Sequence, residues 1–176
     1  AVLTGLWQRS ESVKSYIGSG YQHDFDNGKG DKTALFQAPA GLVGEYEVRF
    51  SFTAGSNRTK KLPVTVTHAG GKTTVIVDQT VTPPIKNRLV SLGRFSFKPN
   101  DRAQVLVETT GTTGHVIIDA VQFLPVTEAD LQAKNANVVR NEKRDAAELE
   151  KLKSQLETLT ARQPQHPVVM SVQEEE

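Results

Sequence analysis

The chain has no cysteine, which excludes disulfide bonds and thiolate metal sites. No apolar run approaches the roughly 18 residues of a membrane-spanning helix, so we expect no membrane partner. The net charge is only +1, which favours neither nucleic acid nor an anionic membrane surface as a partner. Aromatic residues make up 6% of the chain. So few rings cannot form a flat stacking platform beside a core, which counts against binding to crystalline polysaccharides.

Signatures of common catalytic sites are also missing. The sequence contains no Gly-x-Ser-x-Gly nucleophile elbow, no His-Glu-x-x-His zinc helix and no Gly-x4-Gly-Lys-Ser/Thr phosphate loop. Glu45 and Glu47 share the outward face of one predicted strand, where solvated alternation explains them without glycosidase chemistry. We therefore expect a protein that binds its target and is not an enzyme.

Residues 1–126 have the pattern of an all-β domain. In Gly44–Thr53 apolar side chains occupy every second position, the period of a strand with one buried face. Residues 62–79 repeat this alternation on both sides of Ala69-Gly-Gly71, whose glycines permit a tight hairpin. Breaks rich in Gly, Pro, Asn and Asp separate further short strands, including one predicted at His115–Leu124. This pattern predicts an antiparallel β-sandwich of the jelly-roll type.

The pattern changes to a helical one at Thr127. Thr127-Glu-Ala-Asp130 is typical of a capping box, and neither Gly nor Pro follows until Pro164. Four leucines have the 3-4-3 spacing of a coiled-coil seam about two heptads long: Leu149, Leu152, Leu156 and Leu159. So short a seam needs a partner, which is the sandwich, a second copy or another part of a larger protein. We divide the chain into a sandwich (1–126), a charged helical arm (127–162) and a flexible tail or linker (163–176).

Seven motifs carry a resemblance to a known family. In chain order they are Gly20-Tyr-Gln-His-Asp24, Gly44-Glu-Tyr-Glu-Val-Arg49, Ser56-Asn-Arg58, Leu62-Pro-Val-Thr-Val-Thr-His-Ala-Gly-Gly71, Pro83-Pro-Ile85, Ser91-Leu-Gly-Arg-Phe95 and Gly114-His-Val-Ile-Ile-Asp-Ala-Val-Gln-Phe123. Over residues 1–126 the sequence resembles the golvesin C-terminal-like domain, also called the xanthan-lyase carbohydrate-binding-like domain. It looks most like the copies in large secreted planctomycete-type proteins with cytochrome-c-like domains. The resemblance implies a β-sandwich accessory module that binds polysaccharide, is exported to the periplasm or outside the cell, and works beside other domains of its parent protein.

The polar loop between the strands at 45–53 and 62–68 holds the best-placed binding groups, which are Asn57, Arg58 and Lys60. Arginine offers a planar donor fork for a carboxylate or sulfate, and asparagine both donates and accepts hydrogen bonds. A structural interpretation also stays open, in which Asn57 stabilises the loop backbone and Arg58 lies over a strand edge.

Tyr21, His23 and Asp24 precede a glycine-rich loop at residues 26–31. His23 and Asp24 either line a sugar site or form an ordinary polar rim. Asp24, with Asp26 and Asp31, gives three carboxylates in eight residues, which raises a calcium site as an alternative to a solvated turn. Because the spacing departs from the EF-hand pattern, we expect no cofactor, with calcium kept as the alternative.

Two further residues have two interpretations each. Trp7 is the only tryptophan, and it serves either as a stacking surface for a sugar or as a core residue at the sandwich edge. Asp119 lies on the apolar face of a predicted strand, so we expect its carboxylate to clasp backbone amides or an arginine.

The sequence thus predicts a non-catalytic module that recognises a soluble or charged polysaccharide through polar loops. The alternative is a structural or oligomerisation module, in which the sandwich and the leucine-bearing helix self-associate and bind no sugar.

Overall fold

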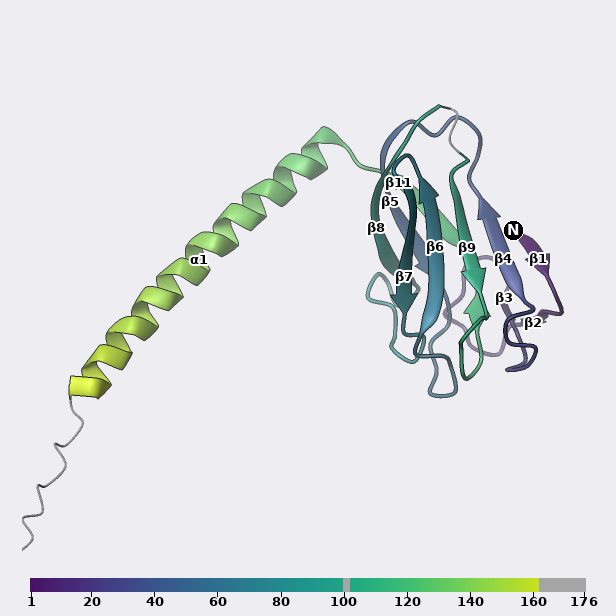
Figure 1. Cartoon of the computed structure of the whole chain (residues 1–176), viewed down its shortest axis with the longest axis horizontal. Coiled ribbons are helices and arrows are strands. Elements are labelled where there is room, and N and C mark those ends of the chain that lie inside the picture. The colour runs from purple at the N-terminus through teal and green to yellow at the C-terminus, as the bar shows by residue number, and fades with distance from the viewer. Residues whose placement is uncertain (100–101, 162–176) are drawn as a thin grey trace, which may run out of the picture. The chain divides into compact units, whose positions relative to one another are not determined.

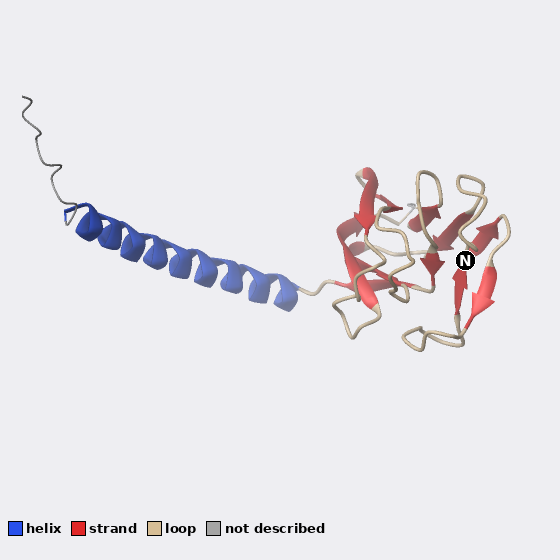
Figure 2. Cartoon of the chain, turned by 90° about the horizontal axis from the view of Figure 1, so that it is seen from below, coloured by secondary structure: helices blue, strands red, loops and turns tan. Residues whose placement is uncertain are grey.

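The computed structural model describes residues 1–99 and 102–161 of the chain. The chain divides into two compact units, and the first comprises Ala1–Thr127. All of the strands belong to this first unit, whereas the second begins at Glu128 with the helix α1 (Glu128–Ala161) (Figures 1 and 2). The tail predicted at residues 163–176 lies outside the described residues.

The strands of the first unit are short and follow one another closely. They are β1 (Val2–Thr4), β2 (Gln8–Ser10), β3 (Tyr21–His23), β4 (Thr33–Gln37), β5 (Gly44–Ser51), β6 (Leu62–His68), β7 (Gly71–Val77), β8 (Leu89–Phe97), β9 (Gln104–Glu108), β10 (Ile117–Ile118) and β11 (Val121–Pro125).

These strands form antiparallel sheets that make the two layers of a β-sandwich. One sheet has the order β1-β4-β9-β6-β7, with β9 and β6 in its interior (Figure 1). The other strands form two three-stranded sheets, β10-β3-β2 and β11-β5-β8. Since β10 leads directly into β11, one stretch of chain links the two smaller sheets. The predicted fold class, a jelly-roll-type sandwich followed by a helical arm, is confirmed.

The core comes from the period-two pattern of the strands. Val48 and Phe50 of β5 and Leu62 of β6 are fully buried, as are their alternating neighbours Val64 and Val66. The interior strand β9 adds two valines to the same apolar cluster. Full burial of each such side chain contributes about 1.5–3 kcal/mol relative to leaving it exposed.

The last predicted strand is interrupted, which differs from the single strand expected at His115–Leu124. β10 pairs with β3 and β11 pairs with β5, so the chain changes partner at Asp119-Ala120. There the Asp119 Oδ2 atom accepts hydrogen bonds from the Ile17 backbone N–H and the Ser51 hydroxyl, both at 2.7 Å. The expected clasp onto a backbone amide is therefore confirmed, and the same clasp marks the point where the strand divides.

The helix α1 follows the sandwich after Val126-Thr127. The four leucines of the predicted seam are 54–66% exposed on the helix. Among the described residues, no helix combines the length and the apolar composition that crossing a membrane requires.

Candidate functional site

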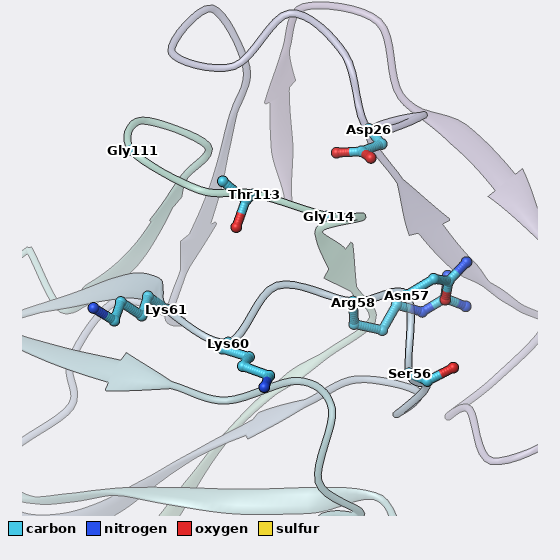
Figure 3. Close-up of a pocket in the computed structure, with 9 residues that line it drawn as sticks. All are labelled: Asp26, Ser56, Asn57, Arg58, Lys60, Lys61, Gly111, Thr113 and Gly114. Carbon is cyan, nitrogen blue, oxygen red and sulfur yellow. The ribbon is translucent and has the colours of Figure 1, made fainter.

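Three loops of the sandwich meet around a polar pocket of about 670 Å³ (Figure 3). The loops follow β3, join β5 to β6, and join β9 to β10. We call this the loop pocket; its lining residues are Asp26, Ser56, Asn57, Arg58, Lys60, Lys61, Gly111, Thr113 and Gly114.

Backbone hydrogen bonds hold two of these loops together. The Thr59 N–H donates to the His115 carbonyl at 3.0 Å, and the His115 N–H donates to the Asn57 carbonyl at 2.9 Å. Behind them, the fully buried Gln79 side chain donates to the Ile117 carbonyl at 2.6 Å and accepts from its N–H at 2.9 Å. The pocket wall is therefore fixed by main-chain pairing before any ligand binds.

Gly114 makes the close approach of these loops sterically feasible. Its φ is +81°, and a Cβ atom built there would lie 3.0 Å from backbone atoms of Asn57 and Arg58. Contacts that short are too close for a carbon atom to fit without moving the opposing loop. Only glycine combines this backbone conformation with this proximity.

The pocket side chains come from opposite walls. Figure 3 shows the Asn57 and Arg58 side chains lying together, with Asp26 on the facing loop and Lys60 and Lys61 farther along the same segment as Arg58. Arg58 is partly buried, and its Nε atom is buried without a hydrogen-bond partner among the described residues. Asn57 and Lys60 are exposed. The structure thus brings the three loop residues predicted from sequence into one pocket.

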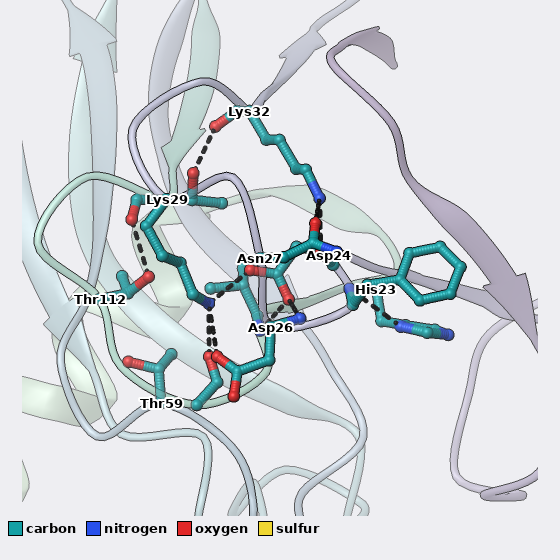
Figure 4. A network of polar contacts seen from close by, with 12 residues as sticks. His23, Asp24, Asp26, Asn27, Lys29, Lys32, Thr59 and Thr112 are labelled. Carbon is teal, nitrogen blue, oxygen red and sulfur yellow. Dashed lines mark hydrogen bonds and ion pairs between the residues drawn. The ribbon is translucent and has the colours of Figure 1, made fainter.

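Beside the pocket, Asp24 is fully buried at the centre of a polar network (Figure 4). Its Oδ2 atom accepts from the Lys29 ammonium at 2.5 Å, and its Oδ1 atom accepts from the Asp26 and Val116 N–H groups at 2.9 Å each. Burial raises the pKa of Asp24, but the hydrogen bonds from Lys29, Val116 and Asp26 outweigh it and hold the pKa below its ordinary value. Asp24 is therefore an ionised anchor that joins the β3 loop to the segment before β10.

Two lysine ammonium groups hold the oxygen atoms that a calcium ion would need. Lys32 Nζ donates to the Asp24 carbonyl at 2.5 Å and to the Asn27 side-chain oxygen at 2.6 Å. Lys29 Nζ, besides its bond to Asp24, donates to the Gly114 carbonyl at 2.6 Å. Within the described part of the chain no three His, Cys, Asp or Glu side chains form a group suited to a metal. In this structure these oxygen atoms are engaged by lysine ammonium groups.

Comparison with known proteins places this sandwich in a family. The family described as Golvesin C-terminal domain matches residues 1–125. The chain belongs to this family. It is 31% identical over 126 residues to a xanthan lyase of Bacillus sp. (strain GL1), covering 70% of this chain but only 13% of that protein.

Solved structures agree with this assignment. The structure of Paenibacillus xanthan lyase superposes with a TM-score of 0.65 at 31% identity, covering 72% of this chain and 12% of that one. A Podospora anserina GH26-CBM35 β-(1,4)-mannanase superposes with a TM-score of 0.51 at 18% identity, covering 72% of this chain and 26% of that one. The second similarity shows the fold alone. In both comparisons this chain matches only a small part of a much longer protein.

Four predicted site residues of this golvesin C-terminal domain do not line the pocket. Tyr21 is 3% exposed, and its hydroxyl lies 3.2 Å from that of Ser12. Because Tyr21 and the fully buried Asp24 are so little exposed, direct contact with a ligand does not fit either residue. Both have a structural role beneath the loops. Trp7 packs against the core and donates its indole N–H to the Thr4 carbonyl at 3.0 Å, as the edge-of-core interpretation expects.

His23 lies next to the pocket rather than in it. Its ring centroid is 4.9 Å from that of Phe25 and 5.8 Å from that of His115. Burial lowers the pKa of His23 below its ordinary value of 6.5, and the nearby charges of His115 and Arg58 lower it further. The ring is therefore neutral at pH 7.

Sequence reasoning missed Phe25 and the loop before β10. Phe25 is 47% exposed, and it has a positive φ of 60°. One sequence feature could have indicated an exposed Phe25. Its bulky ring stands directly before the turn sequence Asp26-Asn-Gly28, and a side chain at the start of such a turn is expected to point away from the core. Thr113 and Gly114 gave no comparable signal, since only the fold brings them against Asn57 and Arg58.

Proposed function

We propose that this golvesin C-terminal domain is a non-catalytic accessory module that binds a soluble or charged polysaccharide in the loop pocket. It would act within a larger exported protein, where it increases the time that its parent spends on the glycan. The observation that carries the proposal is the loop pocket itself, a preformed polar hollow on a rigid sandwich.

The chemistry of the pocket suits hydrogen-bonded sugar recognition. Asn57 supplies an amide that both donates and accepts, and Ser56 and Thr113 supply hydroxyl groups. All three side chains are exposed. A sugar chain offers many hydroxyl groups that match these partners, while an open pocket buries little apolar area. We therefore expect a Kd between millimolar and micromolar, about 4–8 kcal/mol of binding free energy.

The relatives support the class of ligand and the domain context. Xanthan lyase is named for a polysaccharide, and it extends far beyond the part that matches this chain. A module of this kind is expected to supply binding, while other domains of the parent protein supply any chemistry.

A glycan array probed with the full chain tests the proposal. We expect binding to one or more polysaccharides, and Asn57→Ala should reduce that signal. Lys72→Ala is the matched surface control, because Lys72 is exposed on β7 and does not line the pocket. Equal losses with Asn57→Ala and Lys72→Ala, or an array with no signal, would count against the loop pocket as a glycan site.

A second candidate function is structural, and the exposed leucines of α1 favour it. They form a stripe along one side of the helix, and a stripe of this spacing matches the a and d positions of a coiled coil. With Leu149 at a, Glu148 occupies g and Lys153 occupies e. In a parallel pair of helices, Glu148 of one copy then lies opposite Lys153 of the second copy, a complementary charge pair. We therefore propose that a second copy of the chain packs against this leucine stripe in parallel orientation.

Sedimentation equilibrium of the full chain tests this pairing. We expect dimers at high concentration, which Leu152→Asp should abolish. Ser154→Asp is the control, because it places the same charge at the outward f position. A monomer at every concentration would contradict self-association and would leave the glycan proposal unaffected.

A further inference from the structure

The turn that carries Phe25 has an unfavourable backbone conformation. Phe25 and Asp26 are consecutive non-glycine residues with φ of 60° and 57°, and the Asn27 N–H closes the turn onto the Asp24 carbonyl at 3.3 Å. Turns of this type favour glycine or asparagine, whereas a bulky side chain at positive φ is a genuine outlier. Such positions carry a conformational cost, and they cluster at ligand-binding sites.

Hydrogen bonds keep Phe25 in this position. The Asp26 N–H donates to the buried Asp24 carboxylate at 2.9 Å, and the Phe25 N–H donates to His23 Nδ1 at 3.3 Å. The Phe25 ring contacts the His23 ring at a centroid distance of 4.9 Å and a tilt of 60°, while almost half of its surface stays exposed. The turn therefore presents an aromatic face on a rigid support, directly before the pocket residue Asp26.

The loop pocket carries an excess of positive charge. Its carboxylate, Asp26, is paired with Lys29 Nζ at 3.2 Å. Within the described part of the chain, neither the Arg58 guanidinium nor the Lys60 and Lys61 ammonium groups have an ion-pair or hydrogen-bond partner. A partly buried cation without a counterion binds an anion more strongly than an exposed one does, because water screens it less.

Two buried polar atoms of the paired loops also lack partners. Arg58 Nε and His115 Nδ1 are buried without a hydrogen bond among the described residues. Their residues are adjacent, since the two loops form an isolated parallel β-bridge at Arg58 and His115. His115 also contacts the ring of His23, which in turn contacts Phe25. Unsatisfied buried polar atoms are rare in folded proteins, and such groups often mark a functional site.

We infer that the Phe25 ring stacks on one sugar ring and that the Arg58 guanidinium binds the carboxylate or sulfate of an acidic sugar at the same site. This inference rests on the proposed glycan binding and names its substrate class, an acidic polysaccharide. Stacking on Phe25 uses the apolar face of the sugar, while Arg58 offers two parallel donors to its acidic group. Lys60 and Lys61 extend the positive surface toward the next acidic residue of the polymer.

Paired glycans test the substrate class. The full chain is titrated calorimetrically with alginate, polygalacturonate, xanthan and chondroitin sulfate, and with a neutralised form of each. The neutral forms are carboxyl-reduced, and chondroitin sulfate is both carboxyl-reduced and desulfated. We expect one or more of the acidic forms to bind, with roughly tenfold or greater loss on neutralisation, since a hydrogen bond to a charged group contributes about 1.5–3 kcal/mol. Arg58→Ala should cause a similar loss, whereas Lys72→Ala should leave the affinity within twofold, as expected for an exposed charge outside the pocket.

Variants of Phe25 separate a binding role from a structural one. Phe25→Gly removes the ring and also relieves the positive-φ strain, so it should raise the unfolding temperature or leave it unchanged. The same variant should weaken binding by about threefold to tenfold, and Phe25→Trp should restore it. A fall in the unfolding temperature with unchanged binding would show that Phe25 is a packing residue and would overturn its proposed role.

The remaining outcomes distinguish the two proposals. Equal binding to the acidic and neutral forms, with loss only in Asn57→Ala, would overturn the acidic-sugar inference and keep the glycan site. No binding to any of the eight polymers or to the array would overturn both.

Discussion

Replacing Asp24 with alanine should destabilise the sandwich strongly. The carboxylate is fully buried and accepts from Lys29 Nζ at 2.5 Å and from the Asp26 and Val116 N–H groups at 2.9 Å each. Alanine leaves these donors without their acceptor and leaves the largely buried Lys29 ammonium without its closest counterion. Breaking a buried ion pair from one side costs about 3–5 kcal/mol. For a domain of this size, that loss corresponds to a fall of roughly 10–20 °C in the unfolding temperature.

Chemical and thermal unfolding of the full chain, followed by circular dichroism of the strands, measures this effect. Asp24→Asn is the informative companion, because its side-chain oxygen keeps both amide hydrogen bonds while its NH₂ group faces the Lys29 ammonium. We expect an intermediate loss for Asp24→Asn, partly reversed when Lys29→Met removes the facing charge. If Asp24→Ala lowered the free energy of unfolding by less than about 1 kcal/mol yet abolished glycan binding, Asp24 would be a ligand contact and not an anchor.

Three further predictions follow from single contacts. Gly114→Ala should lower both stability and glycan binding, because its Cβ would lie 3.0 Å from backbone atoms of the facing loop. Gly41→Ala is the control, because Gly41 has a φ of +87° with nothing within 4 Å and does not line the loop pocket; it should cost only about 1 kcal/mol and spare binding. Burial raises the pKa of Asp119, so its ionised form costs stability as the pH rises above the ordinary value. Asp119→Asn should therefore match or exceed the wild type at pH 7, while Asp119→Ala, which loses the bonds from Ile17 and Ser51, should be less stable in denaturant titrations. The pKa of His23 is lowered in the folded state, so the unfolded state binds more protons below pH 6.5 and the free energy of unfolding should fall there. His23→Gln should flatten that part of a stability–pH profile, and an unchanged profile would contradict the lowered pKa of His23.

Local sequence patterns predicted the parts of the fold that depend on neighbours in the chain. The alternation through Gly44–Thr53 and the hairpin after His68 appear as β5, β6 and β7, because a strand face and a two-residue turn are decided within a few positions. The strand β2, by contrast, was missed. Its residues are polar and mostly exposed, and it forms by pairing with β3 rather than by burying a face.

The parts that sequence could not predict depend on distant partners. The break between β10 and β11 requires Asp119 to meet Ile17 and Ser51, which lie 102 and 68 residues away in the chain. No local pattern carries that information.

The same reason explains the mixed outcome for the candidate site. Asn57, Arg58 and Lys60 share one polar loop, so their grouping was visible in the sequence, and the structure places all three in the pocket. The burial of Asp24 depends on Lys29 and on Val116, so no local pattern indicated that Asp24 is an anchor. Trp7 was the candidate for a stacking ring, with an edge-of-core place as its alternative, but the structure leaves the Phe25 ring 47% exposed in a turn with a positive φ.

Amide NMR chemical-shift mapping of the full chain, titrated with an acidic oligosaccharide, tests the central claim most directly. If the loop pocket is the binding site, shifts should concentrate at residues 25–27, 56–61 and 111–115, and in Arg58→Ala they should need roughly tenfold more ligand to reach the same size. Shifts confined to β7 or to the helix, or a spectrum that does not change with any acidic oligosaccharide, would contradict the account.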